Sequence, residues 1–348
     1  MRVLIYSPSF LPGLGGLEII MATVADGLMS LGDEVTVVTT TPGAEDGGVP
    51  YRVVRSPGPR ELQSWVRWCD VFHQANVSLR GLWPLLLVRR PWVVSHHSWY
   101  CRPDGRRIWK DNLKRFLLRF AGASIAVSEA VARDLGVPSV VIPNAYRDRL
   151  FRCLEGVRRA DDLLFVGRLV SDKGVDLLLD SLALLHKEGL APTLTIVGSG
   201  PEEEQLKEQA ERLGLTEQLC WRGPLADEAL VAEMNAHAVL VVPSRYREPF
   251  GIVALEGIAC GCVLVGSEGG GLAEAIGPCG LTFPNGDAAA LAAAIRRALE
   301  DLGLREHFRS AAPAHLAAHS AGRQAEGYHR AMAAVLARRG QRRRGAAA

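Results

Sequence analysis

At 348 residues the chain is too long for one ordinary hydrophobic core, and we expect two domains. With 48% hydrophobic and 22% charged residues it resembles a soluble globular protein, and a net charge of +2 gives no indication of a nucleic-acid partner. Seven cysteines without a C-x-x-C spacing favour neither a disulfide framework nor a thiolate zinc site, which suits a reducing cytoplasm. No segment has the ~20 apolar residues of a membrane span, nor a signal-peptide core, so any membrane contact would be at the surface.

Short β-branched segments alternate with longer amphipathic segments in the first half of the chain, which predicts a parallel sheet covered by helices. The first predicted helix stops at Gly32, a suitable left-handed cap. The expected strands are 3–7, 34–39, 92–95, 124–127 and 140–142, and the expected helices include 17–31 and 108–120.

The same alternation restarts after a charged segment without a strand pattern, residues 147–162, which we predict to be the linker. Two such halves predict a ligand cleft between them, at the carboxyl ends of their strands. The expected domains are 1–150 and 151–310, followed by helices over 311–337 that pack toward the N-terminal domain and a disordered basic tail over 338–348. The second half is expected to contain strands 163–166, 193–197, 219–222 and 238–242, with helices 175–187, 202–213, 227–236 and, throughout, 288–337.

Glycine-rich turns follow two of the predicted strands. In the first, Gly15 and Gly16 let the backbone at a helix start approach a ligand, although an ordinary glycine turn would have the same sequence. Glu18 would repel a pyrophosphate there and the G-x-G-x-x-G spacing is missing, so a dehydrogenase is disfavoured. The second turn begins at Gly198, and we expect contacts to a nucleotide base near Gly198, Arg222 and Gly223.

A basic loop leaves the predicted strand at 163–166. Arg168 and Lys173 lie five residues apart on this loop, and both could neutralise a diphosphate, although a solvated basic loop is the alternative. The spacing G-x-x-x-x-G-K-[ST] is absent, which argues against an NTPase.

Residues 248–256, EPFGIVALE, contain two glutamates with seven residues between them, which can occur by chance in helical sequence. Pro249 favours the first turn of a helix, which would put Glu248 at the helix mouth and Glu256 about two turns inside. A nucleotide sugar, with hydroxyls at both ends and phosphates in the middle, would fit such a segment. The amides available to the phosphates would be those of Phe250, Gly251 and Ile252.

The run 244–261 resembles the E-x7-E signature of the retaining glycosyltransferases of family four, whose GT-B fold has two Rossmann-like parallel-sheet domains facing across a cleft. Residues 15–18 are similar to their N-terminal glycine loop, 167–174 to their diphosphate loop, and 126–129 and 141–144 to framework segments. The resemblance spans residues 1–335. One departure is Asn144-Ala145-Tyr146-Arg147, where the family usually has Asn-Gly followed within two residues by Asp.

The resemblance implies roles for particular residues. Arg168 and Lys173 would hold the leaving diphosphate, Glu248 the donor sugar and Glu256 the ribose. His97 aligns best with the active-site histidine of the family, and His96 is the alternative. His73 is expected to be structural or to line the cleft.

The sequence contains no Asp-x-Asp, so fixed positive groups and the helix mouth would replace a metal, and we expect a metal-independent reaction without a cofactor. The resemblance implies retention of anomeric configuration by same-face attack. A GT-B epimerase, a phosphorylase or a non-catalytic sugar-nucleotide-binding protein are the alternatives, and we find no pyridoxal-lysine context for a phosphorylase.

The acceptor is expected to be a glycan or a lipid-linked molecule in the synthesis of a cell-surface polysaccharide or glycolipid. Residues 102–120 contain seven basic and two acidic residues, and helical spacing separates an apolar side from a basic side. This pattern fits either a core face with a solvated face, or docking of a cytoplasmic, peripheral protein on the anionic inner surface of the cell membrane. The apolar residues are Ile108, Trp109, Leu113, Phe116, Leu117 and Phe120, and the basic ones are Arg106, Arg107, Lys110, Lys114, Arg115 and Arg119.

Overall fold

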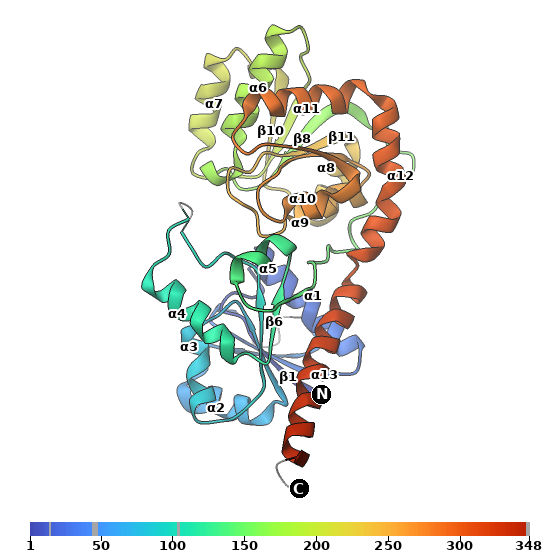
Figure 1. Ribbon diagram of the computed structural model, residues 1–348. Coiled ribbons are helices and arrows are strands. Elements are labelled where there is room, and N and C mark those ends of the chain that lie inside the picture. The colour runs from blue at the N-terminus through green and yellow to red at the C-terminus, as the bar shows by residue number, and fades with distance from the viewer. Residues whose placement is uncertain (14, 44–47, 103–104, 346–348) are drawn as a thin grey trace. The chain divides into compact units, whose positions relative to one another are not determined.

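The computed structural model describes residues 1–13, 15–43, 48–102 and 105–345 (Figure 1). The chain divides into two compact units. The N-terminal unit comprises Met1–Ala145 together with the last helix from Ala321, and the C-terminal unit comprises Tyr146–Ser320. Each unit is built on its own parallel sheet.

The sheet of the N-terminal unit has seven parallel strands in the order β3-β2-β1-β4-β5-β6-β7. Strands β4 and β5 are buried along their whole length, as expected of a sheet covered on both faces. The strand order reverses between β1 and β4, and such a reversal opens a crevice at the carboxyl ends of the strands. The strands are β1 (Arg2–Tyr6), β2 (Glu34–Thr39), β3 (Arg52–Arg55), β4 (Val71–Ala75), β5 (Trp92–His96), β6 (Ala123–Ala126) and β7 (Val140–Val141).

Helix α13 (Ala321–Gly345) belongs to this unit and packs on α1 (Gly16–Ser30), as Figure 1 shows. The two helices meet where Gly27 faces Ala325, since a Cβ at Gly27 would come within 2.4 Å of the Ala325 Cβ. Gly32 ends α1 with a φ of 84°, as predicted. The other helices are α2 (Pro59–Trp68), α3 (Leu79–Leu82), η1 (Trp83–Leu86), α4 (Trp109–Leu117), η2 (Leu118–Phe120) and α5 (Glu129–Leu135).

The apolar side of the segment 108–120 does not form a core face, so that interpretation of the pattern is wrong. Helix α4 has no buried residue, and the side chains of Trp109, Phe116 and Phe120 are 67%, 51% and 68% exposed. The helix stops at Leu117, and the following 3₁₀ turn buries Leu118, which lies outside the predicted apolar stripe. A line of aromatic side chains is therefore left on the surface.

The sheet of the C-terminal unit has six parallel strands in the order β10-β9-β8-β11-β12-β13, with a reversal between β8 and β11. The strands are β8 (Ala160–Val166), β9 (Leu194–Val197), β10 (Leu219–Gly223), β11 (His237–Val242), β12 (Val263–Ser267) and β13 (Gly280–Phe283). The helices are η3 (Ser171–Lys173), α6 (Val175–Lys187), α7 (Glu203–Arg212), η4 (Thr216–Gln218), α8 (Asp227–Ala236), α9 (Ile252–Ala259), α10 (Leu272–Ile276), η5 (Gly277–Cys279), α11 (Ala288–Glu300) and α12 (Leu302–Ala318).

Several boundaries differ from the prediction. The units divide at residues 145 and 146 rather than at 150, so the predicted linker 147–162 lies inside the C-terminal unit. The helical region 288–337 is interrupted at Asp301, whose carboxylate accepts a hydrogen bond from the Leu304 amide and so starts α12. Residues 338–345 continue α13, so the prediction of disorder is wrong for them; residues 346–348 lie outside the described part. No described helix is both long and apolar enough to cross a bilayer.

Candidate functional site

Loops at the carboxyl ends of β8, β11 and β12 pack backbone against backbone. A Cβ at Gly174 would lie 2.1 Å from the carbonyl oxygen of Pro243, and a Cβ at Gly270 would lie 2.1 Å from that of Glu248. Gly174 and Gly270 have φ of 69° and 78°, a region that other residues rarely adopt. The loops that carry Lys173 and Glu248 can therefore approach closely only because these two positions have no side chain.

Lys173 and Glu248 form the centre of the candidate site. Lys173 Nζ donates to Glu248 Oε1 at 2.6 Å, and the Ser244 hydroxyl donates to the same oxygen at 2.8 Å. The side chains of Lys173 and Glu248 are 29% and 12% exposed, so both are partly accessible to a ligand. The sequence predicted Lys173 and Glu248, but not Ser244.

Helix α9 begins later than the sequence indicates. Gly251, with a φ of 108°, is its N-cap, and Ile252 is its first residue. Pro249 lies upstream, next to a bridge in which the Gly271 amide donates to the Glu248 carbonyl at 2.7 Å, so its predicted place in the first helical turn is wrong. The Phe250 side chain is buried in a ring contact with His319, whereas the prediction for this residue concerned its amide.

Glu256 lies about one turn into α9, rather than the predicted two turns. The residue is 9% exposed, and its carboxylate accepts no hydrogen bond from any described residue. Arg147 Nε is 3.8 Å from Glu256 Oε1, too far for a hydrogen bond but close enough for an ion pair. Burial raises the pKa of Glu256 to about 7, and the positive charge of Arg147 opposes that rise.

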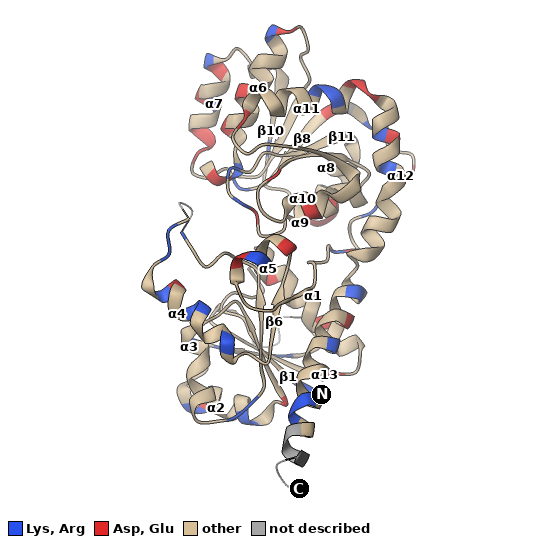
Figure 2. Ribbon diagram, viewed as in Figure 1, with Lys and Arg blue, Asp and Glu red and all other residues tan. Residues whose placement is uncertain are grey.

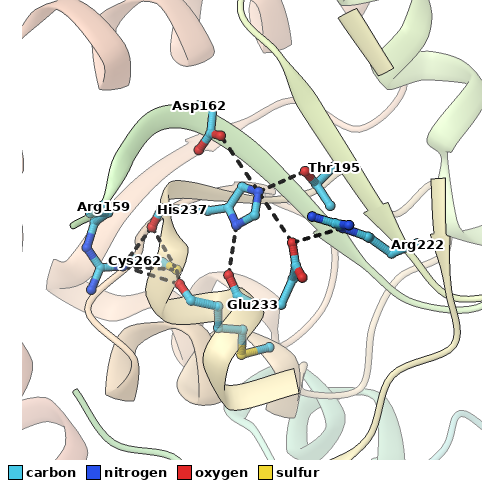
Figure 3. Close-up of polar contacts among 8 residues, drawn as sticks. Arg159, Asp162, Thr195, Arg222, Glu233, His237 and Cys262 are labelled. Atoms are coloured by element: carbon cyan, nitrogen blue, oxygen red, sulfur yellow. Dashed lines mark hydrogen bonds and ion pairs between the residues drawn. The ribbon is translucent and has the colours of Figure 1, made fainter. Parts of the chain in front are cut away.

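The remaining residues predicted for the donor lie after β8, after β9 and at the end of β10. Arg168 is exposed on the loop after β8. The amide of Gly198 donates to the Gly223 carbonyl at 2.8 Å, so these two glycines are neighbours. Arg222, however, pairs with Glu233 of α8 at 3.6 Å (Figure 3).

A polar cluster around His237 is a feature that the sequence did not reveal (Figure 3). His237 contacts the Thr195 hydroxyl at 2.8 Å and the Glu233 carbonyl at 2.7 Å, and its Nε2 is 3.7 Å from Asp162. Burial raises the pKa of Asp162. These contacts join β8, β9, β11 and α8, and we interpret the cluster as structural because none of its contacts involves Lys173, Glu248 or Glu256.

Two predicted features lie in the N-terminal unit. Gly15 is the N-cap of α1 and Gly16 its first residue. The Glu18 carboxylate folds over this turn, since a Cβ at Gly15 would come within 2.4 Å of Glu18 Oε2. Position 14, between these glycines and Gly13, lies outside the described residues.

The second feature is the histidine pair after β5. The side chain of His96 is fully buried, with Nδ1 at 2.7 Å from the Tyr100 hydroxyl and Nε2 at 3.0 Å from the Ser124 hydroxyl. His97 is partly exposed, and its Nε2 is 2.8 Å from the Ser95 hydroxyl. Of the pair, His97 is the residue that is not fully buried, although its Nδ1 is covered by the surrounding residues.

The Ser95 hydroxyl also lies 2.9 Å from Nε2 of His73, which is fully buried and makes an edge contact with the Tyr328 ring of α13. Burial lowers the pKa of His97 to about 3, with Asn144 opposing the shift, so the imidazole is neutral at physiological pH. His73 is thus a structural residue that helps to hold Ser95, and Ser95 in turn holds His97. In the described part of the chain, no group of three or more His, Cys, Asp or Glu side chains could hold a metal ion.

Two family models match the chain: "Glycosyltransferase Family 4" over residues 14–148 and "Glycosyl transferases group 1" over residues 157–315. An uncharacterized glycosyltransferase of Methanocaldococcus jannaschii is 35% identical over 344 residues, which covers 84% of this chain and 87% of that protein. A phosphatidyl-myo-inositol mannosyltransferase of Mycobacterium leprae is 32% identical over 68% of this chain and 65% of its own length. A glycogen synthase of Mycobacterium tuberculosis is 40% identical, but the match spans only 34% of that protein and 40% of this chain.

The crystal structure of Anabaena HepE in complex with UDP has a TM-score of 0.80 and 23% identity, and the match covers 96% of this chain and 100% of that chain. Together with the two parallel sheets, this similarity defines the class of the protein as GT-B. The chain belongs to the family 4 glycosyltransferases.

The two adjacent histidines are expected to respond differently to truncation. His96→Ala removes two buried hydrogen bonds and leaves a cavity, so it should lower the free energy of unfolding by about 2–4 kcal/mol. His97→Ala should cost less, about 1 kcal/mol, because the residue is not fully buried and its ring contacts one hydroxyl, that of Ser95, where the ring of His96 contacts two. Urea denaturation of both variants measures the difference, and equal losses would contradict the structural role given to His96.

Proposed function

We propose that this protein is a retaining glycosyltransferase that moves a sugar from a nucleoside-diphosphate sugar to a glycan or lipid-linked acceptor without a metal ion. The observation that carries the proposal is the cluster in the C-terminal unit. A lysine and a carboxylate meet at 2.6 Å where β8 and β11 end, and a second, buried carboxylate without a hydrogen bond lies one turn into the following helix. A nucleotide-sugar donor needs a cationic group for its diphosphate and hydrogen-bond acceptors for its hydroxyls.

The donor is proposed to bind with its diphosphate at Lys173 and Arg168 and at the first amides of α9, which have no acceptor within the helix. Glu248 would then accept hydroxyls of the sugar, and Glu256 those of the ribose. The similar HepE protein of Anabaena forms a complex with UDP, which supports testing uridine nucleotides first.

Transfer separates a nucleoside diphosphate from an oxocarbenium-like sugar, so negative charge grows on the leaving group. Lys173 and Arg168 provide fixed positive charge for that group, and their positions on a loop packed by Gly174 limit reorganisation. His97 is proposed as the active-site histidine that the N-terminal unit contributes, and its imidazole is neutral because burial lowers its pKa to about 3. Retention by same-face attack is the mechanism expected for the family.

The acceptor side is proposed to dock on an anionic membrane surface through α4 and η2. Figure 2 shows Lys and Arg along α4, in the same segment as the exposed rings of Trp109, Phe116 and Phe120. Lys110 lies 5.6 Å from the Trp109 ring and Arg119 5.7 Å from the Phe116 ring, so cations and aromatics form one surface. Exposed aromatics with basic neighbours suit the interface of an anionic bilayer.

Replacement of the first glutamate tests the catalytic proposal. Glu248→Ala should reduce release of nucleoside diphosphate from UDP-, GDP- or ADP-sugars by about 100-fold or more, because a group that orients the reacting sugar is lost. Binding of the nucleoside diphosphate, measured by calorimetry, should largely persist. Glu228→Ala, which removes an exposed glutamate of α8, is the control. Unchanged turnover in Glu248→Ala would end the assignment.

Metal independence gives a second prediction. Turnover should stay within about twofold in excess chelator, because the positive charge comes from side chains rather than an ion. Lys173→Met should lower turnover by about 100-fold or more, and added magnesium should not restore it. Loss of wild-type activity in chelator, with recovery in magnesium, would show that the donor needs a metal.

Vesicle sedimentation tests the membrane surface. The wild-type protein should bind vesicles that contain phosphatidylglycerol and not vesicles of phosphatidylcholine alone, with binding that falls as salt rises. A variant with Trp109, Phe116 and Phe120 all replaced by Ser should lose about 90% or more of this binding. Leu302→Ser, at a similarly exposed position of the C-terminal unit, is the control. Equal binding of the triple variant would rule this surface out.

A further inference from the structure

Arg147 stands where the family pattern usually has an aspartate, and the structure gives it a defined place beside Glu256. Its guanidinium is held from two directions. Nη1 donates to Asp227 Oδ1 at 2.8 Å, and the guanidinium carbon lies 5.0 Å from the centre of the Phe151 ring. The third nitrogen, Nε, lies 3.8 Å from Glu256 Oε1. The contacts with Asp227 and Phe151 therefore hold the positive charge of Arg147 beside the buried carboxylate of Glu256.

Neither Arg147 Nε nor the Glu256 carboxylate has a hydrogen-bond partner among the described residues. Arg147 Nε is buried and has no hydrogen-bond acceptor among the described residues. The Glu256 carboxylate likewise accepts no hydrogen bond from them. A buried carboxylate normally has its hydrogen bonds made, because leaving them unmade costs about 1–3 kcal/mol per group. The arrangement thus balances the charge of Glu256 while leaving its oxygens available for hydroxyls of a ligand.

We propose that Arg147 is a positioning residue for the donor: it favours the ionised form of Glu256 and orients that carboxylate for the ribose hydroxyls, without binding the nucleotide itself. This inference rests on the donor site proposed above. An aspartate at position 147 would place a second negative charge beside Glu256 and favour its protonated form.

The surroundings of Glu256 support a role for its charge. The titratable groups around it are Arg147, Cys260 at the end of α9 and, beyond Arg147, Asp227. Arg147 is the only cation among them in the described part of the chain. Because burial raises the pKa of Glu256 to about 7 and Arg147 lowers it, removal of Arg147 must move the pKa further upward. Affinity that depends on the carboxylate is then lost below that higher pKa and recovered above it.

Calorimetry with UDP, GDP and ADP, each beside its 2′,3′-dideoxy counterpart, tests the proposal. Arg147→Met should weaken binding of the best-bound ribonucleotide about tenfold at about pH 6 and about twofold or less at about pH 9. A rise of one unit in the pKa of Glu256 lowers the ionised fraction about tenfold at a pH below the pKa. Binding of the dideoxy nucleotide should change little at either pH. The matched control is Arg152→Met. This variant removes a nearby arginine that pairs with the exposed Glu228 of α8, the helix that also contains Asp227.

Two further variants sharpen the test. In a Glu256→Gln background, Arg147→Met should have no additional effect, because the group on which it acts is gone. If Arg147→Met does not fold, Arg147→Gln, which removes the charge but keeps a polar side chain that can still donate to Asp227, should give the same pattern.

Equal losses for the ribonucleotide and the dideoxy nucleotide would overturn the inference and indicate direct contact with the phosphates, while leaving the proposed function intact. If the wild-type protein binds none of the three diphosphates, the proposed function fails and the inference fails with it.

Discussion

The candidate site depends on backbone packing between loops that leave adjacent parallel strands. At Gly174 and Gly270 the neighbouring carbonyl oxygens, those of Pro243 and Glu248, occupy the place where a Cβ would stand. Because strands β8, β11 and β12 are neighbours in one sheet, their loops already leave the sheet side by side. Glycine lets them close the remaining distance, and only then can Lys173 reach Glu248. The ion pair is thus a consequence of the packing.

The fold could be predicted from sequence where apolar periodicity was strong. Helices at 175–187 and 227–236 and the strand at 34–39 have the predicted limits. The sequence analysis did not identify β3, β4, β12 and β13, for reasons visible in their residues. Strand β3 is only four residues long with arginine at both ends, β4 contains His73 and Gln74, and β12 and β13 contain glycines that lower strand propensity. Their place in the sheets depends on neighbours that are distant in sequence.

The site could be predicted only in part. Glycine turns and spacing located Lys173, Glu248 and Glu256, since these are local patterns. Ser244 and Arg147 carry no such signal, because a serine before a loop and an arginine in a charged segment are common. The role of Arg147 depends on Asp227 and Glu256, which are distant in sequence and lie near it only in the folded chain. Likewise the helical pattern of 108–120 identified an apolar side, but not whether the core would cover it.

The resting pair of Lys173 and Glu248 also bears on how a donor would enter. Since both side chains are partly exposed, solvent weakens their attraction. A diphosphate, which brings more negative charge than one carboxylate, can therefore take over the lysine at small cost. Glu248 would keep its hydrogen bond from Ser244, and so its orientation, while its remaining acceptor sites become available to sugar hydroxyls. Without a donor, the same contacts keep both charges paired, so the site needs little rearrangement on binding.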